Sequence, residues 1–203
     1  VPLEQQLGLD PKPLTLKDIR EELDLNTPAL ISARKRIPGA GDAAITSLAQ
    51  QASMEKLLRQ QVSGWLAEKG FPTPGRVRGR MLYPKGTLLR FGTAGIYFPF
   101  CGEGHADAGL HPLQLPPVIA HEMAHGLGFG DEGVCNYIAY AACVNSGDPF
   151  VAYTAQLSYW RTLAANYRSY EPEAYREIRE NLPAGIRADL DDINRNILSY
   201  PDM

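Results

Sequence analysis

The string His121-Glu122-Met123-Ala124-His125 constrains this chain more than any other feature, and it holds two of the chain's four histidines. On an α-helix, residues four apart lie on one face, so the two imidazoles can bind one Zn²⁺ at about 2.0–2.1 Å. Glu122 is then rotated by about 100° from His121 and lies beside the metal. From there it can deprotonate a water molecule instead of binding the metal, as in H-E-x-x-H enzymes.

The flanking residues favour a helix around this string. Pro116-Pro117 is typical of a helix start, while Gly126 and Gly128 are typical of a helix end. The alternative is a core helix with two surface histidines and an exposed Glu122. The rarity of the motif favours the metal site.

Two adjacent carboxylates compete to be the third zinc ligand. Asp131 completes the pattern H-E-x-x-H-x-x-G-x-x-D of metzincin-like enzymes, whereas Glu132 opens a second predicted helix over residues 132–144. Metzincins also need a methionine turn beneath the metal, and the only methionine after the motif is Met203. Asp131 has a sufficient explanation as the N-cap of the second helix. We therefore favour Glu132 as the ligand and keep Asp131 as the alternative.

Asn136 follows Glu132 by one helical turn and faces the same way. We expect it to form a hydrogen bond with a ligand imidazole and so orient it. Tyr97 and Tyr140 are candidates for binding substrate or a developing oxyanion, although most of the ten tyrosines must be packing residues. His105 and His111 are expected to be solvated loop residues.

The segment from His121 to Trp160 resembles a bacterial family known only as a domain of unknown function, whose members are mostly membrane-anchored and resemble zinc peptidases. The segment Gly95–Phe100 and the segment 183–190 are similar to this family too, so the resemblance covers about residues 75–195. It implies a gluzincin-like metallopeptidase that holds one Zn²⁺ through His121, His125 and Glu132. It also implies membrane anchoring through segments outside this chain, and catalysis outside the cytoplasm. The residues that carry the resemblance are Gly128-Phe129, Glu132, Asn136, Ile138-Ala139-Tyr140, Ala142-Cys143, Ser146, Asp148-Pro149, Tyr153 and Leu157-Ser158.

Composition limits the other possibilities. With 203 residues and a net charge of -3, the chain can bury a sizeable core and has no basic surplus for nucleic acid, so we expect a peptide or protein substrate. Three cysteines do not make a disulfide framework. A rival hypothesis is a non-catalytic, zinc-stabilised peptide or cell-wall binding or sensor domain, in which a residue such as His105 closes the fourth metal position.

Hydrophobic periodicity and punctuation by proline and glycine predict the remaining elements. We expect an α+β fold, mainly helical and zincin-like, in one domain over residues 1–203. Its parts are a helical region (1–70), a small sheet and loop (71–112) and the active-site and C-terminal helices (113–203). Pro99 indicates a sheet edge, because proline cannot donate to a ladder. The expected helices are 16–23 with Thr15 as N-cap, 29–36 after a break or kink at Thr27-Pro28, 42–70, and four or five helices from Pro116 with joints at Pro149, Pro172 and Pro183; the expected strands are 76–82, 88–91 and 95–100.

Overall fold

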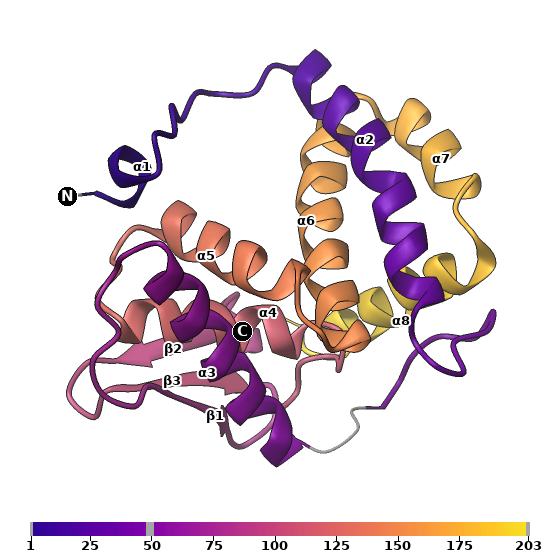
Figure 1. Cartoon of the computed structure of the whole chain (residues 1–203). Coiled ribbons are helices and arrows are strands. Elements are labelled where there is room, and N and C mark those ends of the chain that lie inside the picture. Colours follow the sequence, from indigo (N-terminus) through magenta and orange to yellow (C-terminus); the bar gives the residue numbers. More distant parts are fainter. Residues whose placement is uncertain (1, 48–50, 202–203) are drawn as a thin grey trace.

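A computed structural model describes residues 2–47 and 51–201 and shows a mainly helical α+β fold, as predicted. Figure 1 shows two groups of elements, each around its own apolar core. One group holds a three-stranded sheet with α3, α4 and α5, and the other holds α2, α6, α7 and α8. The helices are α1 (Leu3–Gln6), α2 (Leu16–Lys35), α3 (Gln51–Glu68), α4 (Leu115–Gly126), α5 (Glu132–Val144), α6 (Pro149–Tyr170), α7 (Pro172–Glu180) and α8 (Ala184–Leu198).

The sheet consists of β1 (Arg78–Leu82), β2 (Gly95–Phe98) and β3 (Glu103–Asp107), in the order β1-β3-β2. The central strand β3 runs parallel to β1 and antiparallel to β2. The edge position predicted for the Gly95 strand from Pro99 is therefore confirmed.

The sequence prediction missed β3 and wrongly placed a strand at residues 88–91. Residues 89–91 form a 3-10 helix, because the buried Asp107 carboxylate accepts hydrogen bonds from the backbone of Gly86 and Leu88 at 2.7 and 2.6 Å and curls this segment. Strand β3 has the sequence Glu-Gly-His-Ala-Asp, which lacks the β-branched and aromatic residues typical of strands.

Helix α2 begins as predicted, with a capping box between Thr15 and Asp18. The predicted break at Thr27-Pro28 is wrong, because α2 continues through Pro28. The hydroxyl of Thr27 donates to the Leu23 carbonyl at 2.7 Å beside the proline, and the buried face with Leu23 and Leu30 belongs to the core shared with α6. This burial outweighs the one helical hydrogen bond that proline removes.

The predicted helix over residues 42–70 begins too early. Residues 42–47 are irregular, and the Ile45 N–H donates to the Asp189 carboxylate at 2.8 Å instead of to a helical carbonyl. Leu48, which the prediction placed on the helix, lies outside the described residues. The prolines at 149 and 172 each occupy the first helical position as predicted, while Pro183 is the N-cap of α8, one residue earlier than expected.

A buried network around one ion pair joins α2, α6 and α8 of the second group. The Arg34 Nε donates to the Asp189 Oδ2 at 2.7 Å, and the Tyr153 hydroxyl donates to the same oxygen at 2.6 Å. The other Arg34 nitrogens donate to the carbonyls of Gly41 and Ala43 at 2.6 and 2.8 Å. The network thus fixes α2, the irregular segment after it, α6 and α8 to one another.

We expect Asp189→Ala to lower the free energy of unfolding by about 3–5 kcal/mol, since it leaves the Arg34 charge buried without its partner. The matched control is Asp191→Ala on the same helix, whose ion pair with Arg179 is half-exposed and should contribute about 0–1 kcal/mol. Urea unfolding followed by circular dichroism measures both. Equal losses for the two variants would contradict the importance given to the buried pair.

Candidate metal centre

Helix α4 carries the H-E-x-x-H string and lies against all three strands and against α3, α5 and α6. Ala120, Met123 and Ala124 are fully buried in the first core, while His121 and His125 are only partly buried. The helix begins at its two prolines and ends at the C-cap Leu127, which Gly128 follows at φ 99°. Both ends lie where the sequence predicted. The two histidines therefore share a helix face that is open toward α5.

Three side chains bring their ligand atoms together at this face. The Nε2 atoms of His121 and His125 are 3.1 Å apart. The two Glu132 oxygens lie 3.0 Å from the His121 Nε2 and 3.4 Å from the His125 Nε2. In the described part of the chain, this is the one group of three or more His, Cys, Asp or Glu residues with converging ligand atoms.

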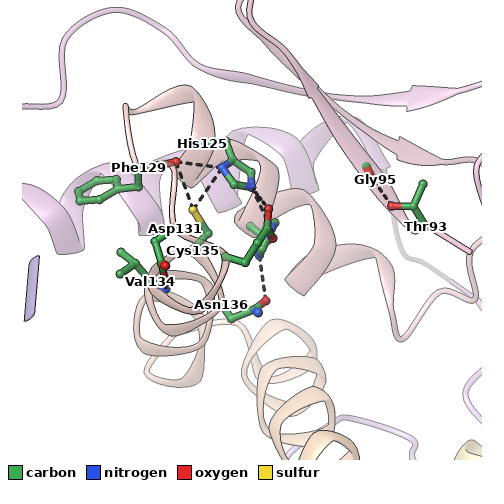
Figure 2. A network of polar contacts seen from close by, with 10 residues as sticks. Thr93, Gly95, His125, Phe129, Asp131, Val134, Cys135 and Asn136 are labelled. Carbon is green, nitrogen blue, oxygen red and sulfur yellow. Dashed lines mark hydrogen bonds and ion pairs between the residues drawn. The ribbon is translucent and has the colours of Figure 1, made fainter. Parts of the chain in front are cut away.

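The opposite nitrogen of each imidazole has a fixed partner. The His121 Nδ1 lies 2.9 Å from the Asn136 Oδ1, and the His125 Nδ1 lies 2.9 Å from the Phe129 carbonyl oxygen. Because both partners are acceptors, they favour the tautomer with the proton on Nδ1, which leaves the Nε2 lone pair available to a metal. Figure 2 shows the hydrogen bond between His125 and the Phe129 carbonyl oxygen. It also shows Asn136, which lies on the adjoining helix α5. The role predicted for Asn136 thus has the geometry that it requires.

Asp131 and Glu132 take different positions, although they are adjacent. The Asp131 Oδ1 accepts the Val134 N–H at 2.9 Å as the N-cap of α5, which is the structural role predicted for it. Glu132 is in the first helical turn, and its side chain is 75% exposed yet turned onto the two imidazoles. The structure therefore brings Glu132, and not Asp131, together with the histidines.

Glu122 is buried against the sheet, with 6% of its surface exposed. Two glycines of the neighbouring strands make room for it: a Cβ added to Gly104 would lie 2.5 Å from the Glu122 Cβ, and one added to Gly95 would lie 2.5 Å from its Oε1. Burial raises the pKa of Glu122 to about 7, and the Glu132 carboxylate adds to this effect. Burial and the neighbouring His125 lower the pKa of His121, which favours the neutral imidazole that a metal needs.

A cavity of about 870 Å³ opens onto these residues. Tyr97 and Tyr140 both line it, from β2 and α5. The Tyr97 ring stacks on His125 with ring centroids 6.5 Å apart, whereas the Tyr140 hydroxyl donates to Gln156 at 3.3 Å. Tyr97 is thus the closer of the two to the metal-binding face.

The whole chain, residues 1–203, matches the model of a family described as "Protein of unknown function (DUF3810)". The chain belongs to this family. Neither the curated proteins nor the solved structures gave a match. Among the described helices, none is both long and apolar enough to cross a membrane. Membrane anchoring and catalysis outside the cytoplasm remain expectations from the resemblance.

The expectation that His105 and His111 are solvated loop residues is wrong. His105 is partly buried on the central strand β3, and its ring packs edge-on against Phe98 with centroids 5.1 Å apart. His111 is 3% exposed, and its Nε2 lies 2.9 Å from the Asp192 Oδ2. Both residues were misplaced because β3 and the partner on α8 were not recognisable in the sequence.

Sequence reasoning also missed several residues that shape the site. They are the Phe129 carbonyl, the two glycines beside Glu122, and Cys135, whose Sγ lies 3.4 Å from both the His125 Nδ1 and the Phe129 oxygen. Burial raises the pKa of Cys135 to about 12, so the thiol stays protonated. Backbone groups and glycines carry no motif, and only the tertiary packing shows their role.

We expect Gly104→Ala to destabilise the fold by about 1–3 kcal/mol, because the new methyl group meets the Glu122 Cβ and, at 3.1 Å, its carbonyl carbon. Gly95→Ala should cost less, since it meets the carboxylate end of a side chain that can rotate away. Gly147→Ala, with open space around the new methyl group, is the control. Urea unfolding measures all three, and a Gly104→Ala variant as stable as the control would contradict this packing.

Proposed function

We propose that this chain is a zinc-dependent metallopeptidase in which His121, His125 and Glu132 hold one zinc ion and Glu122 is the general base. One observation carries the proposal. The ligand atoms of the three candidate ligands lie 3.0–3.4 Å from one another, and Glu122, on the helix that carries both histidines, lines the same cavity. The cavity has room for part of a polypeptide, and ligand pockets of about 300–1,000 Å³ are typical of small-molecule sites.

The donor set fits zinc. Two imidazole nitrogens and one carboxylate are the His₂Glu ligands of many catalytic zinc sites, which keep a fourth position open for water. In such sites, the ring nitrogen that does not bind the metal typically forms a hydrogen bond. Here the Nδ1 of His121 bonds to Asn136, and the Nδ1 of His125 bonds to the Phe129 carbonyl. Asp131, the metzincin-like alternative, is occupied as a helix cap.

The position of His105 weakens the rival hypothesis of a closed, non-catalytic zinc site. Successive residues of a strand point to opposite faces. Because Gly104 faces Glu122, His105 faces the other side of the sheet, where it packs against Phe98. His105, the example of a fourth ligand given for that hypothesis, therefore lies on the wrong face of the sheet to close the site.

Zinc in this site would polarise the scissile carbonyl and acidify a water molecule. Glu122 accepts a proton from the attacking water and delivers it to the amine nitrogen as the peptide C–N bond breaks. Burial raises the pKa of Glu122 to about 7 in the metal-free site, and a carboxylate with a raised pKa is the better acceptor of the proton from water. Asn136 and the Phe129 carbonyl hold the imidazoles in orientation, and Tyr97 would donate to the developing oxyanion.

An extended peptide fits the edge of β2. This strand pairs with β3 on one side only in the described sheet, and Gly95, Ile96 and Tyr97 line the cavity. Its free edge could bind a substrate as an additional strand and carry the peptide past the metal. This geometry favours a peptide or protein as the substrate class.

Metal content distinguishes the candidate ligands. We expect the purified chain to hold one zinc ion, and His121→Ala or Glu132→Ala to lose it. Asn136→Ala should weaken zinc binding by about 10–100-fold, as outer partners of zinc ligands do. The control is Asp131→Asn, because asparagine is an equally good N-cap and should leave zinc binding unchanged. Mass spectrometry of metals and competition with a zinc chelator measure this; loss of zinc in Asp131→Asn alone would overturn the assignment of Glu132.

Replacement of the general base should separate binding from turnover. We expect Glu122→Gln to keep its zinc and to lower kcat on a fluorogenic peptide mixture by at least about 10²–10⁴-fold. Glu103→Gln is the matched control, since Glu103 lies on the sheet away from the cavity and pairs with Arg80. Full turnover by zinc-loaded Glu122→Gln would contradict the role of Glu122.

A further inference from the structure

Arg161, on α6, is a partly buried cation without a counter-ion. Within residues 2–47 and 51–201, it forms neither a hydrogen bond nor an ion pair, and burial lowers its pKa. Arg34, the other arginine in a buried setting, has a carboxylate and two carbonyls as partners. A guanidinium remains charged in proteins, so a buried one without a partner is costly. This cost suggests that the partner of Arg161 comes from outside the chain.

A small pocket of about 60 Å³ lies at Arg161, where α4 begins. Gln114 and Ser158 line it as the other polar residues, and the Gln114 Oε1 is buried without a hydrogen-bond partner. Leu113 and Leu157 form part of its apolar wall. Two residues whose polar groups lack hydrogen-bond partners thus line one concave space, and native proteins rarely leave such groups unsatisfied.

The nearby acidic side chain is already occupied. Asp192 precedes Ile193, which lines the pocket, but its carboxylate bonds to His111 and Arg195 at 2.9 and 2.6 Å. No Asp or Glu is among the residues that line the pocket in the described structure. The pocket is therefore net positive, and the start of α4 adds the positive end of the helix dipole.

We propose that this Arg161 pocket, formed by Gln114, Ser158 and Arg161, binds a carboxylate group. A volume of 60 Å³ holds about two water molecules, and a carboxylate is of similar size. The planar guanidinium fork matches two carboxylate oxygens. Rotation of the Gln114 amide by 180° exchanges the positions of its oxygen and its NH₂, so that the NH₂ can donate to the same anion.

The pocket adjoins the large cavity, because Pro117, Val118 and Ser158 line both. Along α4, Gln114 lies seven residues before His121, which is roughly 10 Å at 1.5 Å per residue. An extended peptide covers that distance with about three residues. If the chain is the metallopeptidase proposed above, the Arg161 pocket would bind the C-terminal carboxylate of a peptide cleaved about three residues from its end.

A binding experiment tests the pocket independently of catalysis. Acetate is titrated into the unmodified chain while the side-chain NMR signals of Arg161 and Gln114 are followed. We expect saturable shifts of both signals, absent for the Gln114 signal in Arg161→Gln and retained in the control Arg168→Gln, an exposed arginine on the same helix. Unchanged signals, or equal shifts in Arg161→Gln, would mean that water alone fills the pocket and would overturn the proposal.

A peptide pair identifies the source of the carboxylate. Acetylated tetrapeptides with a free or an amidated C-terminus are titrated calorimetrically into zinc-loaded Glu122→Gln. A preference of about tenfold or more for the free carboxylate, lost in the added Arg161→Gln change, supports a substrate carboxylate. Equal binding of both peptides, with acetate still bound, supports a site for a free small carboxylate and overturns the peptide placement. Because the acetate titration needs neither zinc nor turnover, failure of the proposed function leaves its result interpretable.

Stability provides a second check on Arg161. Because its charge lacks a partner, Arg161→Gln should have an unfolding midpoint in urea equal to or above that of the unmodified chain. Added acetate should raise the midpoint of the unmodified chain only. A lower midpoint for both Arg161→Gln and Arg161→Lys, without any response to acetate, would show that Arg161 serves the fold and would overturn the proposal.

Discussion

The close approach of α4 to the sheet is the constraint on which the candidate site depends. Gly104 and Gly95 leave space where any other residue would place a Cβ against Glu122. Gly79 on β1 does the same for Ile119, where a Cβ would lie 2.4 Å from the Ile119 Cγ2. Because the helix lies so near, Glu122 is buried, and its burial raises its pKa toward neutrality. The same glycines that permit the packing therefore also set the protonation of the candidate base.

The second helix of the site, α5, positions Glu132 and Asn136 against the histidines. Its cap at Asp131 fixes where the helix begins, and this start puts Glu132 in the first turn and Asn136 one turn later on the same side. Glu132 then reaches the Nε2 atoms of the two histidines, and Asn136 reaches the Nδ1 of His121. A negative side chain in the first turn is also favoured by the helix dipole. The capping interaction and the ligand geometry thus support one another.

Local signals were enough to predict the parts of the structure that depend on local chemistry. The Thr15 cap, the first-turn prolines of α6 and α7 and the start of α5 follow from capping rules. The shared face of His121 and His125 follows from helical spacing, whereas the approach of Glu132 also depends on the packing of α5 against α4. The failures all involve tertiary contacts. Strand β3 has poor strand propensity and owes its position to its neighbours and to the packing of α4. Helix α2 survives Pro28 because its buried face packs with α6, and residues 42–47 leave the helical path to bond Asp189.

Arg34 and Arg161 contrast a cation that stabilises the fold with one for which we propose a ligand. Arg34 is buried and Arg161 is partly buried, so both incur a desolvation cost. Arg34 recovers it through Asp189 and two carbonyls, which join two helices and a loop. Arg161 forms no hydrogen bond or ion pair in the described chain and instead lines a pocket that shares residues with the cavity of the candidate metal centre. A fold gains no stability from such a charge, so binding of a carboxylate explains the position of Arg161 better than a structural role does.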